Sequence, residues 1–348
     1  MRTIDLRSDT VTLPTPEMRE AMYRAEVGDD VYGEDPTVVR LERMAAERLG
    51  KEAALLVVSG TMGNLVSLLT HCGRGDEAIM GDQSHTFRYE QGGVSSLGGI
   101  VIHTVPNLPN GMLEPADVEA AVRDPNNIHY PRSRVVCLEN THNRCGGAVL
   151  LPAQMATIRA VAVRYGLAVH LDGARIFNAA VALGIEAREI AAQVDTVQFC
   201  LSKGLAAPVG SLICGSADFV QEARRNRKGV GGGMRQAGVI AAAGIVALEH
   251  MVERLADDHA NAQRLAQGLA EMPWFDVNLA GVQSNIVIFA VRDAAVPVVR
   301  ISQALLAKGV KMNPFGPNQI RAVTHYGLER EDIDAALVAC REVMSELA

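Results

Sequence analysis

The sequence has no long apolar run, no basic tract and no paired-cysteine motif. No stretch approaches the ~18 uninterrupted apolar residues of a membrane span, and the first residues lack the apolar core of a signal peptide. Lys and Arg number 33 against 40 acidic residues, with no run long enough to follow a nucleic-acid backbone. We therefore expect neither nucleic acid nor a membrane as a partner, and we expect a cytoplasmic protein.

The six cysteines are scattered, form no CxxC pair, and several lie inside apolar runs. This pattern is typical of buried reduced thiols, so we expect neither a disulfide nor a structural zinc. The chain also lacks a Walker loop and a GxGxxG followed by an acidic residue about 20 positions later, which disfavours a nucleotide-binding protein.

Apolar runs alternate with helical patterns over the first two thirds of the chain. The runs are mostly non-alternating, which predicts strands buried on both faces of a predominantly parallel sheet. Helices are expected between them, for example at 64–70, 152–165 and 217–227. The predicted strands, which would form a mostly parallel seven-stranded sheet in an α/β architecture, are 53–58, 77–80, 100–104, 134–138, 168–171, 196–201 and 210–214.

The last third has a different pattern. A long helix is expected over 236–272, ended by Pro273, followed by a small α+β module. We therefore predict a large domain over 16–250 and a small domain over 251–348 that includes the N-terminal segment 1–15. The elements expected in the module are strands 275–279 and 284–289, helix 298–308, strands 310–313 and 320–323, and helix 330–347.

Lys203 and Asp172 carry the clearest chemical signal. Lys203 follows the predicted strand 196–201, and Asp172 follows the predicted strand 168–171 in the run Asp172-Gly173-Ala174-Arg175. An amine and a carboxylate at neighbouring strand ends are what pyridoxal 5'-phosphate (PLP) requires, because the amine condenses with its aldehyde and the carboxylate keeps the pyridine nitrogen protonated. A solvated loop lysine and an ion pair between Asp172 and Arg175 are the alternatives without a cofactor.

Other candidates follow neighbouring predicted strands. Gly60 and Thr61 open a helix whose N–H groups would suit a phosphate, although a simple helix cap looks the same. His85 would reach the same edge of the sheet, where an imidazole can lie against a pyridine ring or act as acid or base. A structural, hydrogen-bonding histidine is the alternative.

Several further side chains offer hydrogen bonds or positive charge. Ser202 can bind a phosphate, and Lys228 and Arg235 flank a glycine-rich loop that a flexible subunit contact would explain equally well. Arg175 can reach the cofactor's phenolic oxygen or a substrate carboxylate. Arg321, in a strand of the small module, is expected to bind the α-carboxylate of an amino acid bidentately, assisted by Ser8.

With these pieces in order, the chain closely resembles the low-specificity L-threonine aldolases, in the aspartate aminotransferase-like (fold type I) superfamily of PLP enzymes. The blocks that carry the resemblance span nearly the whole chain and include Ser202-Lys203-Gly204 and Asp172-Gly173-Ala174-Arg175. They are residues 5–12, 28–37, 139–143, 171–178, 201–205, 231–236 and 320–325.

The resemblance implies a role for each candidate. Lys203 would bind PLP covalently, Asp172 would pair with the pyridine nitrogen and His85 would stack on the ring. His129 matches a family histidine near the substrate's β-hydroxyl, and family members are homotetramers with active sites between subunits. Phosphate ligands would be Gly60, Thr61 and, from a neighbouring subunit, Arg235 or Lys228, and substrate ligands would be Ser8, Tyr32, Arg175 and Arg321.

The expected reaction is reversible cleavage of L-threonine or L-allo-threonine to glycine and acetaldehyde, with His85, or a water held by His85 and His129, as the base. The PLP motif alone also fits a β-eliminating lyase or an aminotransferase of the same fold. Two departures from the family pattern, Tyr326-Gly327-Leu328 and the bulky run after His85, leave the substrate side chain open.

Overall fold

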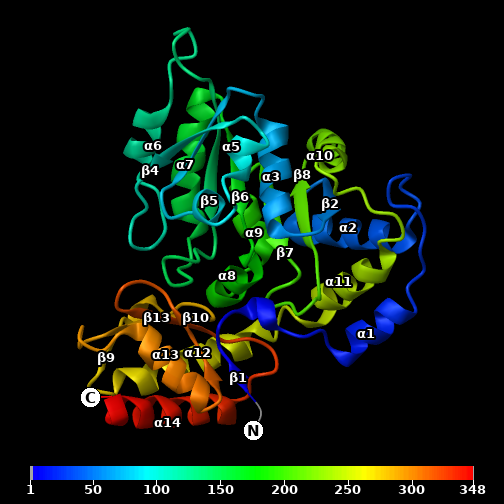
Figure 1. The fold of residues 1–348 in the computed structure, drawn as a ribbon. Helices are drawn as coiled ribbons and strands as arrows, with labels where there is room; N and C mark the ends of the chain where they lie inside the picture. Colours follow the sequence, from blue (N-terminus) through cyan, green and yellow to red (C-terminus); the bar gives the residue numbers. More distant parts are fainter. Residues whose placement is uncertain (1–2, 348) are drawn as a thin grey trace.

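A seven-stranded sheet forms the centre of the larger part of the protein in the computed structural model, which describes residues 3–347 (Figure 1). Its strand order is β2-β8-β7-β6-β5-β3-β4, and only β8 runs against the others. The predicted mostly parallel seven-stranded sheet is confirmed. The strands are β2 (Ala53–Val57), β3 (Glu77–Gly81), β4 (Val101–Val105), β5 (Ser133–Glu139), β6 (Ala168–Asp172), β7 (Thr196–Cys200) and β8 (Ser211–Gly215).

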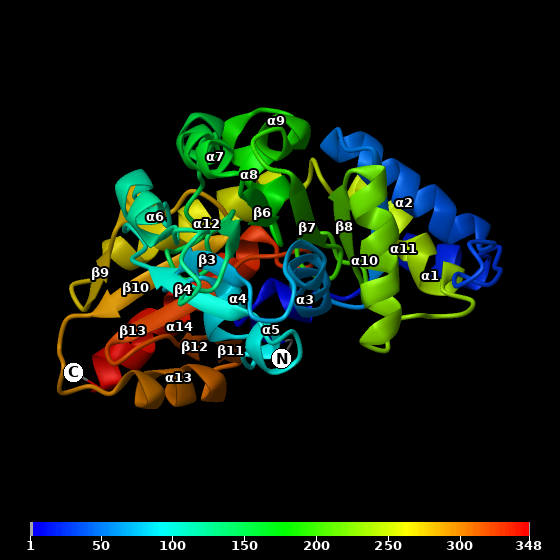
Figure 2. The same ribbon diagram turned by 90° about the horizontal axis from the view of Figure 1, so that it is seen from above.

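Helices cover both faces of this sheet. Seen from above, α3 and α10 lie on one side of the central strands, and α7, α8 and α9 lie on the other (Figure 2). All residues of β3, β7 and β8 are buried, which explains why their sequences are mostly apolar rather than alternating. The helices of this part are α1 (Pro16–Tyr23), α2 (Pro36–Leu49), α3 (Gly60–His71), α4 (His85–Arg88), α5 (Gly93–Ser96), α6 (Pro115–Ala121), α7 (Pro152–Tyr165), α8 (Ile176–Leu183), α9 (Ala187–Ala191), α10 (Ala217–Gly229) and α11 (Gly238–His250).

Local capping fixes where the helices next to the site begin. The Ser59 hydroxyl accepts from the Met62 N–H at 3.2 Å, so α3 starts directly after β2. The carboxylate of Asp35 accepts from the Thr37 and Val38 N–H groups at the start of α2. At its other end α2 stops at Gly50, whose φ of 60° is in the left-handed region that glycine adopts without strain.

A four-stranded antiparallel sheet of order β12-β13-β10-β9 forms the smaller part, and β1 pairs in parallel with β11 beside it. The predicted strand 310–313 is therefore wrong as a single element, because its two halves pair with different partners. The elements are β1 (Ile4–Asp5), α12 (Leu255–Ala270), β9 (Phe275–Val277), β10 (Ile286–Val291), α13 (Val298–Ala307), β11 (Val310–Lys311), β12 (Asn313–Pro314), β13 (Gln319–Val323) and α14 (Arg330–Leu347).

The predicted helix 236–272 is also wrong, because two helices occupy that range. α11 ends at His250 and α12 begins at Leu255, with turns between them. α11 packs against α1 and α2 of the larger part, whereas α12 packs against α14 and β9 of the smaller part and against α8. One straight helix cannot serve both surfaces, and the buried Met251 and Val252 lie at the turn. The domain limits 16–250 and 251–348 stay a prediction.

All six cysteines are unpaired, and all but Cys145 are buried. Among residues 3–347, no helix combines the length and the apolar character needed to cross a bilayer.

Candidate active site

The carboxyl ends of neighbouring parallel strands bring His85, Asp172 and Lys203 to one edge of the large sheet. Asp172 is the last residue of β6 and lies opposite Glu139, the last residue of β5. His85 begins α4 shortly after β3, and Lys203 follows the end of β7. These three residues lie at or just after the ends of β3, β6 and β7, and with β5 between β6 and β3 the four parallel strands end at one edge of the sheet.

The carboxylate of Asp172 is buried and held by three donors. Gln198 Nε2 donates to Oδ1 at 2.8 Å, the Ala174 N–H donates to Oδ1 at 3.1 Å, and Asn64 Nδ2 donates to Oδ2 at 2.9 Å. Burial alone would raise the pKa of Asp172, but the nearby charges of His85 and Lys203 with these donors outweigh burial and lower it. Asp172 is therefore a carboxylate at neutral pH, and Oδ2 has capacity for a further donor.

His85 is anchored at both its backbone and its ring. Its N–H donates to Glu139 Oε2 at 2.7 Å, and its ring Nδ1 lies 2.9 Å from Glu90 Oε1. Burial disfavours the charged imidazole, but the hydrogen bond to Glu90 and the charge of Asp172 prevail and raise the pKa of His85. The imidazole thus lies close to both Glu90 and Asp172. Its Nε2 forms no hydrogen bond with either acid within the described residues.

The side-chain amine of Lys203 has no hydrogen bond to another described residue, although its charge lowers the pKa of both Asp172 and Asp9. A half-buried amine without a partner, next to two carboxylates, is available for a covalent bond. Ser202, its neighbour, is half-buried as well.

The first turn of α3 borders the end of β7. A Cβ built on Gly60 would come within 2.8 Å of Cys200 Sγ, so only glycine fits this close approach. The N–H groups of Gly60 and Thr61 lack acceptors within the helix, as at any helix start, and Thr61 is exposed. The structure therefore places the expected phosphate ligands Gly60 and Thr61 at the same strand edge as Lys203.

Arg175 forms a buried ion pair with Asp9, a residue to which the sequence assigned no role. Its Nε and one terminal nitrogen lie 2.6 and 2.7 Å from the two carboxylate oxygens. The alternative of an ion pair between Asp172 and Arg175 is absent from the described contacts. Breaking such a buried pair from one side costs about 3–5 kcal/mol, so Asp9 fixes the position of Arg175.

Arg321 approaches the same region from the small sheet. It donates to Asn143 Oδ1 at 2.8 Å and to the Arg7 carbonyl at 3.3 Å, while its Nε is buried without a partner among the described residues. Burial and the nearby charge of Arg175 lower the pKa of Arg321. Ser8 is next to both Arg7 and Asp9 in the chain, and its hydroxyl accepts from the Thr10 N–H. Arg175 pairs with Asp9, whereas Arg321 only feels the charge of that carboxylate, so two guanidinium groups near one buried carboxylate leave positive charge for an anion.

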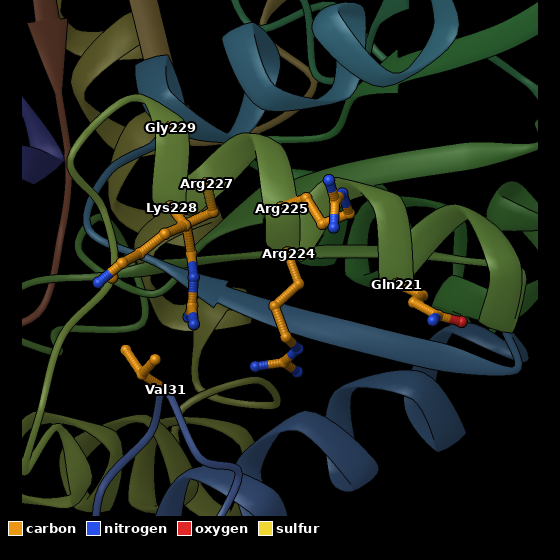
Figure 3. Close-up of a pocket in the computed structure, with 8 residues that line it drawn as sticks. Val31, Gln221, Arg224, Arg225, Arg227, Lys228 and Gly229 are labelled. Carbon is orange, nitrogen blue, oxygen red and sulfur yellow. The ribbon is translucent and has the colours of Figure 1, made fainter.

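Tyr32, Lys228 and Arg235 lie in a different part of the structure from Lys203. Lys228 lines a hollow of about 580 Å³ beside α10, into which Arg224 and Arg227 also reach toward the loop of Val31 (Figure 3). Arg235 pairs with Asp29 at 2.8 Å, and Tyr32 is 74% exposed in the same turn. Within residues 3–347, none of the three contacts Lys203, Asp172 or His85.

His129 is exposed in the loop that leads from α6 into the amino end of β5. Because Asp172 ends β6 at the carboxyl edge of the same sheet, His129 lies toward the opposite edge. The structure therefore does not bring His129 to the site within one chain.

Sequence reasoning missed Asn64, Glu90, Gln198 and Asp9. Gln198 is the only one with a usable signal, because it is a polar residue in the middle of a fully buried strand. Asn64 and Glu90 lie in helical or loop sequence where polar residues are ordinary, and their contacts with Asp172 and His85 depend on the fold.

Comparisons with known proteins agree with this geometry. The Beta-eliminating lyase family matches residues 5–292. Low-specificity L-threonine aldolase 1 of Arabidopsis thaliana is 45% identical over 347 residues, which cover 99% of this chain and 97% of that protein. The low specificity L-threonine aldolase of Escherichia coli (strain K12) is 44% identical over 330 residues, which cover 95% and 96%.

Among solved structures, a threonine aldolase from Leishmania major superposes with a TM-score of 0.82 at 21% identity, over 98% of this chain and 99% of that one. This likeness confirms the predicted aspartate aminotransferase-like fold of type I. By its sequence relatives, the chain belongs to the beta-eliminating lyase family and, within it, to the low-specificity L-threonine aldolases.

Proposed function

We propose that the protein is a PLP-dependent lyase that cleaves L-threonine, L-allo-threonine and related β-hydroxy-α-amino acids reversibly to glycine and an aldehyde, which is acetaldehyde for threonine. The observation that carries the proposal is the convergence of three groups at one edge of the large sheet: an amine without a hydrogen-bond partner within residues 3–347, a buried carboxylate, and the guanidinium group of Arg175. The guanidinium group of Arg321 reaches the same region from the small sheet. Relatives with the threonine aldolase name at 44% and 45% identity select this reaction among those that the fold supports.

The residues present fit PLP. The amine of Lys203 is free to bond with an aldehyde, and Asp172 Oδ2 can accept from a protonated ring nitrogen. Gly60 leaves room against Cys200 where a side chain would intrude, and the N–H groups of α3 point to a phosphate site beside it. Ser202, which is half-buried next to Lys203, would add a hydroxyl donor. When bound, PLP supplies an electron sink for the electrons released as the Cα–Cβ bond breaks.

Arg321 and Arg175 would bind the substrate's α-carboxylate, with Ser8 beside them. The buried, unpartnered Nε of Arg321 supplies a donor, and the Asp9 pair keeps Arg175 in place. Holding the carboxylate fixes which bond at Cα is aligned for cleavage, so these residues control the reaction by orientation.

His85 would accept the proton of the β-hydroxyl. Its Nδ1 is held by Glu90, which leaves Nε2 as the nitrogen that can take the proton. His129 reaches this site only from another copy of the chain, so the proposal assigns the base to His85.

The test compares products. The purified enzyme, supplied with PLP, is given L-threonine and L-allo-threonine, and aldehyde release is followed through a coupled alcohol dehydrogenase. In parallel, L-serine and L-cysteine are tested for pyruvate and ammonia. We expect aldehyde and glycine in equal amounts from the threonine isomers. Ammonia or a ketoacid as the main product would favour a β-eliminating lyase or an aminotransferase instead.

Replacing Arg321 with glutamine is expected to raise the KM for L-threonine about 10- to 100-fold with a smaller change in kcat. A hydrogen bond to a charged group contributes about 1.5–3 kcal/mol, and this one is formed in both the bound and the reacting state. Steady-state kinetics measure the change. Arg264→Gln, at a half-buried arginine paired with Asp334, is the control and should leave KM unchanged. An unaltered KM in Arg321→Gln would remove Arg321 from the substrate site.

We also propose that the protein works as a homo-oligomer, a homotetramer as the family resemblance implies, in the cytoplasm. Tyr32, Lys228, Arg235 and His129 are exposed away from Lys203, so they could serve a site only across a subunit contact. Unpaired cysteines fit a reducing compartment. A single species of monomer mass in sedimentation velocity would contradict the oligomer.

A further inference from the structure

A line of hydrogen bonds runs through the sheet behind Asp172. His71 Nε2 lies 2.8 Å from Thr196 Oγ1, and the same hydroxyl lies 3.0 Å from His170 Nδ1. His170 Nε2 lies 3.2 Å from Asn64 Oδ1. Burial and the nearby His71 lower the pKa of His170 to about 3, so its imidazole is neutral and carries one N–H.

The chemistry of these groups fixes the direction of each bond. Asn64 Oδ1 can only accept, so His170 carries its proton on Nε2 and accepts at Nδ1 from Thr196. The amide nitrogen of Asn64 therefore faces the site. Its two hydrogens reach Asp172 Oδ2 at 2.9 Å and Glu90 Oε1 at 2.8 Å. Glu90 Oε1 is thereby an acceptor.

The same oxygen of Glu90 lies 2.9 Å from His85 Nδ1. An ionised carboxylate oxygen can only accept, so Glu90 Oε1 accepts from His85 as it does from Asn64, and the imidazole proton lies on Nδ1. Polar atoms of His85, Glu90 and Asp172 all lie within 4.8 Å of one another. The three groups therefore form one compact unit, in which the orientation of His85 is set by Glu90.

The carboxylate of Glu90 contributes little to the stability of the fold. Its second oxygen, Oε2, is buried and has no hydrogen-bond partner among the described residues. Burial raises the pKa of Glu90, and an unsatisfied buried acceptor costs free energy that an apolar side chain would avoid. Packing alone gives no reason for an acid at this position.

We propose that Glu90 is a positioning residue: it holds His85 by Nδ1 so that Nε2 is offered to the reacting substrate, and it shares the Asn64 amide with Asp172 so that the three groups keep one arrangement. The role of Glu90 in turnover rests on the proposed function, whereas its role in orienting His85 does not. The test measures turnover and the orientation of His85 separately.

The charged groups that face His85 come from four elements. They are Glu90 after α4, Glu139 at the end of β5, Asp172 at the end of β6 and Lys203 after β7. Among them Glu90 makes the direct contact with the imidazole ring.

Below the raised pKa of His85 both ring nitrogens are protonated and Nε2 cannot accept a proton, so turnover should rise with pH through that pKa. Removing the Glu90 charge should move this rise to lower pH.

Three variants test the proposal. Glu90→Met removes the acceptor at similar size, and Glu90→Gln keeps an acceptor but removes the charge. Glu77→Gln is the matched control, because Glu77 is equally buried and lies 3.4 Å from His103 Nδ1 at the amino end of β3, away from the site. The kcat and KM for L-threonine are measured against pH. Nitrogen-15 spectra of histidine-labelled holoenzyme, with His85 assigned by its loss in His85→Gln, report which ring nitrogen carries the proton.

We expect Glu90→Met to lower kcat about 30- to 100-fold, part of what a general base contributes, with KM within about threefold. Its spectrum should show the His85 proton exchanging between Nδ1 and Nε2. Glu90→Gln should keep the Nδ1 proton, retain kcat within about tenfold and begin its rise at lower pH. Glu77→Gln should match the wild type.

An unchanged Nδ1 proton in Glu90→Met, or a loss of kcat no larger than in Glu77→Gln, would overturn the proposal. If Glu90→Met does not fold, the wild-type spectrum decides: above the imidazole titration, a proton on His85 Nε2 alone overturns the proposal, and a proton on Nδ1 supports it. A protein that fails to cleave threonine but shows the Nδ1 proton contradicts the proposed function only.

Discussion

Replacing Lys203 with alanine will abolish turnover of L-threonine, with kcat lowered by at least about 10⁴-fold, the scale on which removing a covalent nucleophile acts. The amine of Lys203 is half-buried and unpartnered among the described residues, next to the carboxylates of Asp172 and Asp9. The charge of Lys203 lowers the pKa of Asp172. Aldehyde release under saturating substrate measures the loss, and the absorbance of bound cofactor should change with it.

Lys51→Ala is the matched control. Lys51 is also half-buried, but its amine binds the Val194 carbonyl at 2.5 Å near the amino end of the sheet. We expect this variant to retain the wild-type kcat. Turnover by Lys203→Ala within tenfold of the wild type would show that the amine is not the group that bonds the cofactor.

Asp172→Asn should lower kcat about 10²- to 10³-fold while some cofactor remains bound, a loss comparable to removing one preorganised electrostatic contact. Two effects add. The amide cannot hold the ring nitrogen in its protonated form as a carboxylate does, and an amide nitrogen at the Oδ2 position would face the donor Nδ2 of Asn64 at 2.9 Å. Kinetics with cofactor titration separate lost chemistry from lost binding.

Gln198→Leu offers a comparison for Asp172→Asn, since it removes one of the three donors but keeps the carboxylate. We expect Gln198→Leu to lower kcat less than Asp172→Asn does. If Asp172→Asn kept near wild-type kcat at saturating cofactor, the carboxylate would have no role in stabilising charge on the ring.

The strands of the large sheet could be predicted because burial on both faces makes most of their sequences predominantly apolar. β6 and β7 were placed within one residue of their observed ends, which put Asp172 and the approach to Lys203 at the right edge. Their order in the sheet follows from crossover connections that no single strand sequence encodes.

The helix prediction over 236–272 failed for a physical reason. Residues 251–254 contain no proline or glycine, so local propensity gives no stop signal. The turn there arises because α11 and α12 pack on different partners, which is a tertiary effect.

The site also combines residues that local sequence indicates with residues that only the tertiary fold brings together. Lys203, Asp172 and His85 follow strands and could be expected from sequence. Asn64 and Asp9 gain their roles from contacts across 26 to 166 positions, and Glu90 gains its role from the fold of the loop that returns it to His85. His129 entered through family resemblance and Arg235 as a cation beside a glycine-rich loop, and the fold of one chain places both away from Lys203.

Reduction of the PLP-loaded enzyme with borohydride, followed by proteolysis and peptide mass spectrometry, tests the central claim most directly. The account predicts a stable pyridoxyl group on the peptide that contains Lys203 and on no other. A modified peptide carrying a different lysine, or no modified peptide from a sample that binds PLP, would contradict it.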